Sequence, residues 1–269
     1  MAHHLYGFMV HEQPLEFYFD YIVGHGIRHL EIDLKKKHSL LGTFTPSRIA
    51  AIREFSDRND ISLSLHPPFA MNLCSWNPWV RRYHISYLEK CIRLADQLPA
   101  RYITLHLGNF HRSAAWYNPR QQALERLVRV LAKLLPVCEI NHVCLALENV
   151  VPIAPEAGFA FLGDNINDFL YIFSCFKSAY LKLCLDIGHA HTAEGTLAYV
   201  EKLGTKIIGA HFHDNQGSHD EHLEVGKGTV PWKALAAALE KIGFYGPFVS
   251  ECFKSPPHEA IELLKKHSS

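Results

Sequence analysis

Short apolar runs alternate with longer amphipathic stretches along this chain of 269 residues. Eight of the short runs are rich in β-branched and aliphatic residues, as the buried strands of a parallel sheet are. These predicted strands are Leu5–Val10, His29–Asp33, Ile61–His66, Tyr102–Leu107, Val143–Glu148, Leu181–Asp186, Ile207–His213 and Pro247–Glu251. The unbroken alternation predicts successive βα units, because parallel neighbours need a crossover connection.

A stretch with helical periodicity follows each predicted strand, and two of these stretches open with the proline that suits a first helical turn, at Thr45-Pro46 and Val230-Pro231. The predicted helices are about Leu15–Val23, Pro46–Arg58, Trp79–Gln97, Pro119–Leu135, Asn167–Phe176, Thr196–Leu203, Pro231–Ile242 and His258–Lys266. No glycine-rich phosphate loop follows the first strand, which argues against an open doubly wound sheet. Eight units in this length predict an α/β fold, a single (β/α)8 TIM barrel that spans residues 1–269 as one domain.

The composition narrows the class of protein further. Hydrophobic residues make up 48% and charged residues 20% of the chain, as in ordinary globular proteins. There is no apolar run of about 20 residues and no export signal at the N-terminus, and the seven cysteines show no C-x-x-C spacing, so we expect a cytoplasmic protein that does not contact a membrane. Lys plus Arg equals Asp plus Glu at 27 each, so no global field attracts a polyanion.

Histidines and carboxylates lie at the C-terminal ends of six of these apolar strands. In a closed barrel such residues converge on one mouth, where the active sites of these barrels are found. Buried charged groups are costly unless they are paired or bind a cation, so six together predict a divalent metal site. They are His66, His106, Glu148, Asp186, His211 and Glu251.

Two short spacings add three further candidate ligands. Asp186-Ile-Gly-His189 places a histidine one turn after the sixth strand, and Asp220-Glu-His222 places a carboxylate and an imidazole in the loop after the seventh. Mixed nitrogen and oxygen donors favour Zn or Mn over Ca. Because nine donors exceed the needs of a single ion, the sequence predicts one to three divalent ions.

Other residues near the predicted mouth are candidates for contacts with substrate. His213 lies two residues after His211 and therefore points to the same side of the strand. Trp76 is in a loop at the mouth, where its ring is suited to stack on a base or a sugar. Lys35 and Lys36 belong to a basic run just after the second strand, which either binds phosphate or is a solvated loop.

Several of these segments together resemble the xylose isomerase-like barrels, the superfamily that joins endonuclease IV with sugar and sugar-phosphate isomerases and epimerases. The resemblance runs in matching order from about His29 to Glu251. The segments are His66-Pro-Pro-Phe-Ala-Met-Asn-Leu, His106-Leu-Gly, Leu147-Glu148-Asn149, Cys184-Leu-Asp186-Ile-Gly-His189-Ala, His211-Phe-His-Asp214 and Asp220-Glu-His222-Leu-Glu-Val-Gly226-Lys-Gly228.

The resemblance implies two alternative activities. Epimerase-type members imply one divalent ion at the positions that match Glu148, Asp186, His211 and Glu251, with the two glutamates as catalytic acid and base. Endonuclease IV members imply three zinc ions at positions that match all nine candidates. Since the stretch 215–228 looks more like the isomerase and epimerase branch, we predict a metal-dependent sugar or sugar-phosphate isomerase or epimerase. The alternative is an AP endonuclease or phosphodiesterase that acts on DNA.

Overall fold

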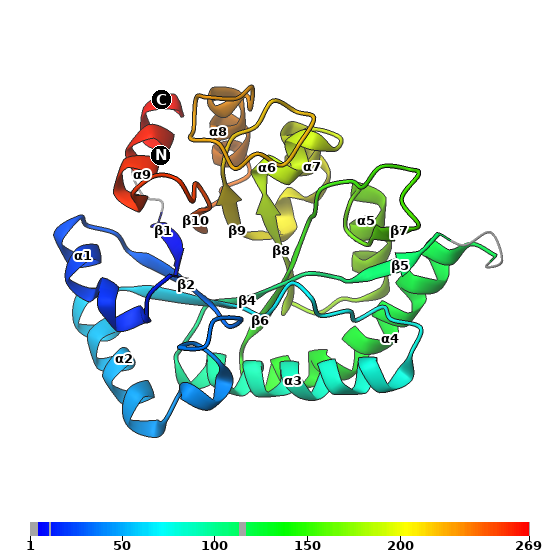
Figure 1. Ribbon diagram of the computed structural model, residues 1–269, viewed down its shortest axis with the longest axis horizontal. Helices are drawn as coiled ribbons and strands as arrows, with labels where there is room; N and C mark the ends of the chain where they lie inside the picture. The colour runs from blue at the N-terminus through cyan, green and yellow to red at the C-terminus, as the bar shows by residue number, and fades with distance from the viewer. Residues whose placement is uncertain (1–4, 11, 113–116, 269) are drawn as a thin grey trace.

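Eight parallel strands close into a barrel in the computed structural model, which describes residues 5–10, 12–112 and 117–268. The order around the barrel is β1-β10-β9-β8-β6-β4-β3-β2, and the helices lie outside the strands (Figure 1). The barrel strands are β1 Leu5–Val10, β2 His29–Asp33, β3 Ser62–His66, β4 Tyr102–Leu105, β6 Cys144–Glu148, β8 Leu181–Asp186, β9 Ile207–Phe212 and β10 Pro247–Ser250. The predicted eight-fold barrel is confirmed.

The helices follow the predicted pattern with two differences. The helices of the structure are α1 Phe19–Gly24 with a 3-10 turn at Leu15–Tyr18 before it, α2 Pro46–Asn59, α3 Pro78–Gln97, α4 Pro119–Ile140, α5 Ile166–Cys175, α6 Ile187–Thr192, α7 Thr196–Leu203, α8 Trp232–Lys241 and α9 Pro257–His267. Helix α4 continues past Leu135 and through Pro136, because Cys138 in its last turn is still buried in the core. The unpredicted α6 begins where the Asp186 side chain accepts a hydrogen bond from the His189 backbone N–H. None of the helices in these described ranges is long and apolar enough to cross a membrane.

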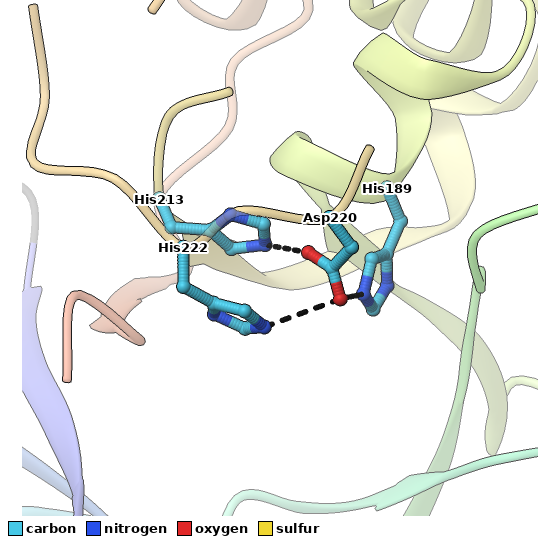
Figure 2. Close-up of side chains that lie close together, drawn as sticks. All are labelled: His189, His213, Asp220 and His222. Atoms are coloured by element: carbon cyan, nitrogen blue, oxygen red, sulfur yellow. Dashed lines mark hydrogen bonds and ion pairs between the residues drawn. The ribbon is translucent and has the colours of Figure 1, made fainter. Parts of the chain in front are cut away.

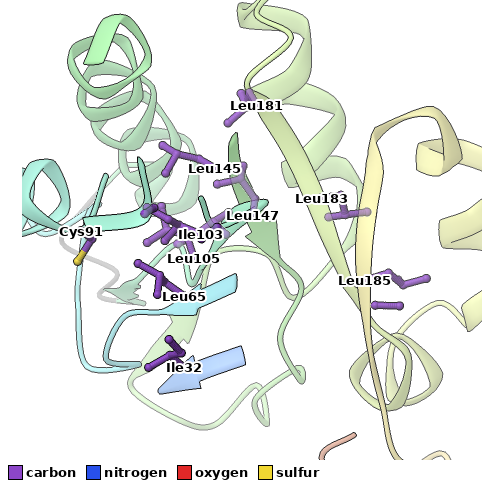
Figure 3. Close-up of a cluster of buried hydrophobic side chains, with 14 of the residues drawn as sticks. Ile32, Leu65, Cys91, Ile103, Leu105, Leu145, Leu147, Leu181, Leu183 and Leu185 are labelled. Atoms are coloured by element: carbon purple, nitrogen blue, oxygen red, sulfur yellow. The ribbon is translucent and has the colours of Figure 1, made fainter. Parts of the chain in front are cut away.

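The strands separate apolar from polar side chains by their alternation. Residues two apart on a strand point to the same side, so each strand presents one set outward and one set inward. Figure 3 shows leucine and isoleucine side chains of β2, β3, β4, β6 and β8 gathered in one buried cluster, with Cys91 of α3 beside them. The inward sets of β3, β4 and β8 instead include Ser64, Thr104 and Cys184, all buried. The barrel interior is thus lined by small or polar groups that lead up to its mouth.

A small second sheet was not predicted. Strands β5, Asn109–His111, and β7, Phe159–Phe161, pair antiparallel and join the loops that follow β4 and β6. The ring of Phe69, from the loop after β3, contacts Phe161 at 5.3 Å and His106 at 4.6 Å between centroids. These aromatic contacts hold the second sheet against the mouth of the barrel.

Close approach of β1 to β2 requires the glycine at position 7. A Cβ atom on Gly7 would lie 2.2 Å from the backbone carbonyl oxygen of His29, which cannot move without disturbing the sheet. We expect Gly7→Ala to lower the free energy of unfolding by about 1–3 kcal/mol, as overpacking does, in urea titrations. Gly42→Ala is the control, because a Cβ there meets no atom within 4 Å. Equal stability of the two variants would contradict the expectation.

Candidate metal centre

All nine predicted ligands converge at the C-terminal mouth of the barrel, and His213 joins them. Within each of three groups, one donor atom from every residue lies within 4.8 Å of the others. The first group is His66, His106 and Glu148; the central group is Glu148, Asp186, His211 and Glu251; the third group is His189, His213, Asp220 and His222. Glu148 belongs to two groups, so the first and central groups are contiguous. That these residues bind metal stays a prediction.

The central group is held by strands β6, β8 and β9 and by the residue after β10. The Nδ1 atom of His211 lies 2.8 Å from Glu148 Oε1, 3.2 Å from Glu251 Oε1 and 4.0 Å from Asp186 Oδ2. All four side chains are buried. One nitrogen and three carboxylates therefore face one small space.

Glu31, in the middle of β2, fixes the other edge of the same imidazole. Its Oε1 lies 2.7 Å from His211 Nε2, while its Oε2 accepts hydrogen bonds from Ser64 Oγ at 2.7 Å and Thr104 Oγ1 at 2.8 Å. Burial opposes the ionisation of Glu31, but His211 beside it lowers its pKa to about 2. A carboxylate on the far nitrogen orients a ligand histidine, so Glu31 leaves Nδ1 of His211 free to bind a cation.

The first group places two histidines on the other oxygen of Glu148. His66 Nε2 lies 3.3 Å and His106 Nε2 3.1 Å from Glu148 Oε2. The Nδ1 atom of His66 is paired with the Pro67 carbonyl at 2.9 Å, so the ring turns its Nε2 toward the carboxylate. This group has three donors, which leaves room for a further ligand.

The third group is built from α6, from the end of β9 and from the loop after it (Figure 2). Asp220 Oδ2 lies 3.3 Å from His189 Nε2 and 3.2 Å from His222 Nε2. The remaining ring nitrogens are anchored on backbone, His189 Nδ1 on the Asn149 carbonyl at 2.9 Å and His222 Nδ1 on the Glu251 carbonyl at 3.0 Å. One anchor is the backbone of Glu251, a member of the central group, and the other is the backbone of Asn149, the residue after Glu148.

Asn149 and Asp214, for which no role was predicted, hold the ligand-bearing segments in place. Asn149 accepts from the Asp186 backbone N–H through Oδ1 and donates to the Asp186 carbonyl through Nδ2, both at 2.8 Å. Asp214 accepts hydrogen bonds from the Gly226 and Val230 backbone N–H groups and from Trp232 Nε1. Asn149 thereby ties β6 to β8, and Asp214 closes the loop that carries Asp220 and His222.

The electrostatics of the centre suit cations. Burial opposes the ionisation of Glu148, but His106 and His211 hold its pKa well below the usual range. Burial lowers the pKa of His66, yet its hydrogen bond to Glu148 outweighs this effect and raises the pKa to about 9. Burial, together with the neighbouring carboxylates of Asp186 and Glu148, raises the pKa of Glu251 above its ordinary value although His211 opposes the shift. Buried carboxylates that are offset only by imidazoles are the environment that a divalent ion relieves.

Buried polar atoms without a hydrogen-bond partner also indicate that the centre suits a divalent ion. Within the described part of the chain, several buried atoms of the three groups make no hydrogen bond although they belong to strongly polar side chains. Such atoms are rare in folded proteins unless a ligand or an ion completes them. They are His106 Nδ1, Asp186 Oδ2, His211 Nε2, His213 Nδ1 and Nε2, and Asp220 Oδ1. The donors present therefore fit one or more divalent metal ions.

The residues predicted to contact substrate, unlike the predicted ligands, do not all converge on the three groups. Lys35 Nζ lies 3.1 Å from the buried carboxylate of Asp33, and Lys36 Nζ lies 3.9 Å from Glu12. Trp76 is 62% exposed and borders a cavity of about 170 Å³ outside the three ligand groups. That Lys35, Lys36, Trp76 and His213 contact substrate stays a prediction.

Glu31 is the residue of the centre that the sequence reasoning missed. The signal was the alternation His29-Leu-Glu31-Ile-Asp33, which puts three polar side chains on one face of a strand in the way that the ligand strands do. Asn149 and Asp214 appeared in recognised segments, but their roles depend on backbone groups that only the fold brings near them.

The sequence matches the family model of the xylose isomerase-like TIM barrel over residues 19–267. The chain belongs to this family. The predicted superfamily is thereby confirmed.

Individual relatives include proteins of both predicted kinds. The uncharacterized protein MJ1311 of Methanocaldococcus jannaschii is 29% identical over 84% of this chain and 74% of its own length. A probable endonuclease 4 of Aquifex aeolicus is 26% identical over 76% of this chain and 71% of its own. The crystal structure of a D-tagatose 3-epimerase-like protein is similar at a TM-score of 0.83 and 27% identity, over 97% of this chain and 96% of that one.

The contact between Glu31 and His211 predicts an effect on metal affinity. Replacing Glu31 by glutamine keeps the shape of the side chain but removes the charge that orients the imidazole. We expect Glu31→Gln to weaken binding of Mn at the central group by about 10- to 100-fold in calorimetric titration of the metal-free protein. The control is Glu54→Gln, since Glu54 is 69% exposed on α2. Unchanged affinity in Glu31→Gln would mean that Glu31 supports the fold alone.

Proposed function

We propose that this chain is a metal-dependent isomerase or epimerase of a sugar or sugar phosphate, with Mn or Zn at the central group. The observation that carries the proposal is the placement of Glu148 and Glu251. Glu148 ends β6 and Glu251 directly follows β10, on either side of β8 and β9, and both approach the same nitrogen of His211. Two carboxylates that flank one small space are suited to exchange protons with one substrate carbon.

A divalent ion held by Glu148, Asp186, His211 and Glu251 would polarise the carbonyl and hydroxyl oxygens of a sugar. One glutamate removes the proton from the carbon beside the carbonyl, and the other returns a proton from the opposite side, which changes the configuration. His211 keeps both carboxylates in place, because its ring is fixed by Glu31 from below. Burial of the group excludes bulk water, which would otherwise compete for the exchanging protons.

A cavity near the ends of β1 and β10 has the size of a small molecule. It measures about 270 Å³ and lies between the ends of β1 and β10, where Phe8, Tyr18, Ser250 and Phe253 line it. Phe253 also contacts the ring of His222 at 4.9 Å between centroids, so one lining residue of the cavity reaches the third group. Aromatic side chains with a few polar groups suit the carbon chain and hydroxyls of a sugar.

The charges at the mouth also support a small substrate over a nucleic acid. Binding to a polyanion draws its affinity from cations that neutralise phosphates. Here Lys35 and Lys36 each have a carboxylate within 4 Å, and Arg112 donates to the carbonyls of Ile153 and Ala154. The carboxylates offset the charges of Lys35 and Lys36 and so reduce the attraction that DNA would feel there, and the backbone contacts of Arg112 hold its guanidinium against its own chain.

A second candidate is cleavage of a phosphoester, and a specific observation favours it. The first and third groups bring together His66, His106, His189, Asp220 and His222, which a single ion at the central group does not need. Clustered ions generate hydroxide and stabilise both the attacking and the leaving oxygen of a phosphoester. The relative named as a probable endonuclease 4 belongs to this class.

Proton exchange tests the first proposal directly. In D2O, the wild-type chain loaded with Mn should incorporate deuterium beside the carbonyl of a ketose, as seen by proton NMR. We expect Glu148→Gln and Glu251→Gln each to slow this exchange by about 10²- to 10⁴-fold, since each loses a proton-transferring group. Glu201→Gln, on the exposed side of α7, is the matched control. Metal-loaded protein that exchanges no proton with ketopentoses, ketohexoses or their phosphates would contradict the proposal.

An oligonucleotide with one abasic site tests the second candidate. We expect no cleavage above the metal-only background with Zn or Mn, and we expect His106→Ala to leave proton exchange within about tenfold of wild type, because His106 lies outside the central group. His142→Ala controls for removal of a histidine remote from the mouth, where His142 contacts Tyr180. Cleavage that is abolished in His106→Ala and retained in His142→Ala would establish the phosphoesterase instead.

A further inference from the structure

We propose that His29 is a positioning residue of the metal centre. Through the hydroxyl of Ser64 it fixes a hydrogen bond that Glu31 accepts, and Glu31 in turn sets which nitrogen of His211 faces the central group. The inference goes beyond the proposed function and holds for either reaction, because it concerns the orientation of a candidate ligand and not the chemistry at the ion. It extends the support of His211 by two side chains, away from the mouth of the barrel.

His29 lies inside the barrel at the first position of β2. It precedes Glu31 by two residues and so shares its inward face, and its side chain is fully buried. The register between β2 and β3 pairs His29 with Ser62 and Glu31 with Ser64. The ring lies between the two serines, with Nδ1 2.9 Å from Ser62 Oγ and Nε2 3.0 Å from Ser64 Oγ. Both ring nitrogens of His29 therefore have a partner.

The direction of each hydrogen bond follows from the carboxylate of Glu31. A carboxylate only accepts, so the single hydroxyl hydrogen of Ser64 points to Glu31 Oε2, 2.7 Å away. Thr104 donates to the same oxygen at 2.8 Å, which leaves no room there for a proton of the carboxyl group itself. Because Ser64 has given its hydrogen to Glu31, it accepts from His29. The hydrogen of the His29 ring is therefore on Nε2.

A neutral imidazole supplies what is needed at position 29. Burial lowers the pKa of His29 to about 3, although Glu31 opposes the shift. The ring is therefore uncharged at neutral pH and has one N–H group and one acceptor nitrogen. With the hydrogen on Nε2, the acceptor is Nδ1, which receives the hydroxyl hydrogen of Ser62. The hydrogen bonds then run in one direction, from Ser62 through His29 and Ser64 to Glu31.

The opposite tautomer of His29 would disturb this series. With the hydrogen on Nδ1, the bare Nε2 would draw the hydroxyl hydrogen of Ser64 away from Glu31. Lone pairs of Ser64 Oγ would then face the carboxylate at 2.7 Å, and Glu31 would keep only the Thr104 hydroxyl on Oε2. Loss of a hydrogen bond destabilises the charged form of a buried carboxylate. His29 thus holds Glu31 in the form that only accepts.

The form of Glu31 decides which nitrogen of His211 is free. Oε1 of Glu31 lies 2.7 Å from His211 Nε2, where two lone pairs would repel each other, so the hydrogen of a neutral His211 ring is on Nε2. Nδ1 then presents its lone pair to the three carboxylates of the central group. A histidine binds metal through an unprotonated nitrogen. The series that begins at His29 therefore keeps His211 ready to bind a cation.

A role in packing alone is the alternative for His29. Its ring lies beside that of Tyr102, with 6.2 Å between centroids, and so fills part of the barrel interior. In that case the loss of either serine contact would leave metal binding unchanged. The two serines separate the roles, because both contact the same ring from the same strand but only Ser64 also reaches Glu31.

Nitrogen NMR of the metal-free full chain, with 15N in its histidines, reads the tautomer of His29 without any substrate. We expect one ring to stay uncharged between about pH 5.5 and 8, where exposed histidines titrate, with its hydrogen on Nε2. Its signals are assigned to His29 by their absence in His29→Gln. A His29 ring with its hydrogen on Nδ1, or with both nitrogens protonated at neutral pH, would overturn the proposal.

Metal affinity measures the consequence at His211. In calorimetric titrations of the metal-free protein with Mn, we expect Ser64→Ala and His29→Leu each to bind about 3- to 10-fold more weakly than wild type, a smaller loss than at Glu31 itself. Ser62→Ala is the matched control and should bind Mn as wild type does. His29→Gln should recover most of the affinity, because its amide N–H can donate to Ser64 in place of Nε2–H.

Thermal unfolding of each variant shows first that it is folded. Should His29→Leu fail to fold, the two serine variants and the spectrum of wild type still decide the question. Equal Mn affinity of folded Ser62→Ala and Ser64→Ala would overturn the proposal in favour of packing alone. Absence of proton exchange in wild type, with the affinities as expected, would instead count against the proposed function alone.

Discussion

The buried imidazole of His211 contacts four carboxylates at once. Nε2 faces Glu31, and Nδ1 faces Glu148, Asp186 and Glu251. Each carboxylate comes from a different strand, so one ring on β9 joins β2, β6, β8 and the end of β10 at the mouth. Burying so many acidic groups together is unfavourable unless positive charge compensates them. The need for compensation is the physical reason why the mouth collects further imidazoles and suits metal ions.

The strand alternation decides where this polar cluster lies relative to the hydrophobic core. The outward leucines stabilise the barrel against its helices, and the inward face carries serine, threonine and cysteine below the ligands. Substitutions of the outward leucines therefore act on the packing of the barrel against its helices, and substitutions of the inward residues act on the polar contacts below the ligands. The scaffold is stabilised from outside, while the inner face is left for polar contacts such as that of Ser64 and Thr104 with Glu31.

The strands and most ligands could be predicted because each depends on a local pattern. A run such as Leu-Ala-Leu-Glu148 shows both the buried strand and the polar group at its end. The second sheet could not be predicted, since β5 and β7 have three residues each and pair only across two loops. Helix α6 depends on the cap supplied by Asp186. The grouping of the donors depends on distances between segments far apart in the chain.

Glu148 divides its two oxygens between neighbouring groups. Oε2 meets His66 and His106, whereas Oε1 meets His211. Loss of the two histidines leaves Oε1 and its contact in place, but loss of the glutamate disrupts both groups together. A substitution at position 148 therefore alters two groups at once, whereas substitutions at positions 66 and 106 alter the first group alone.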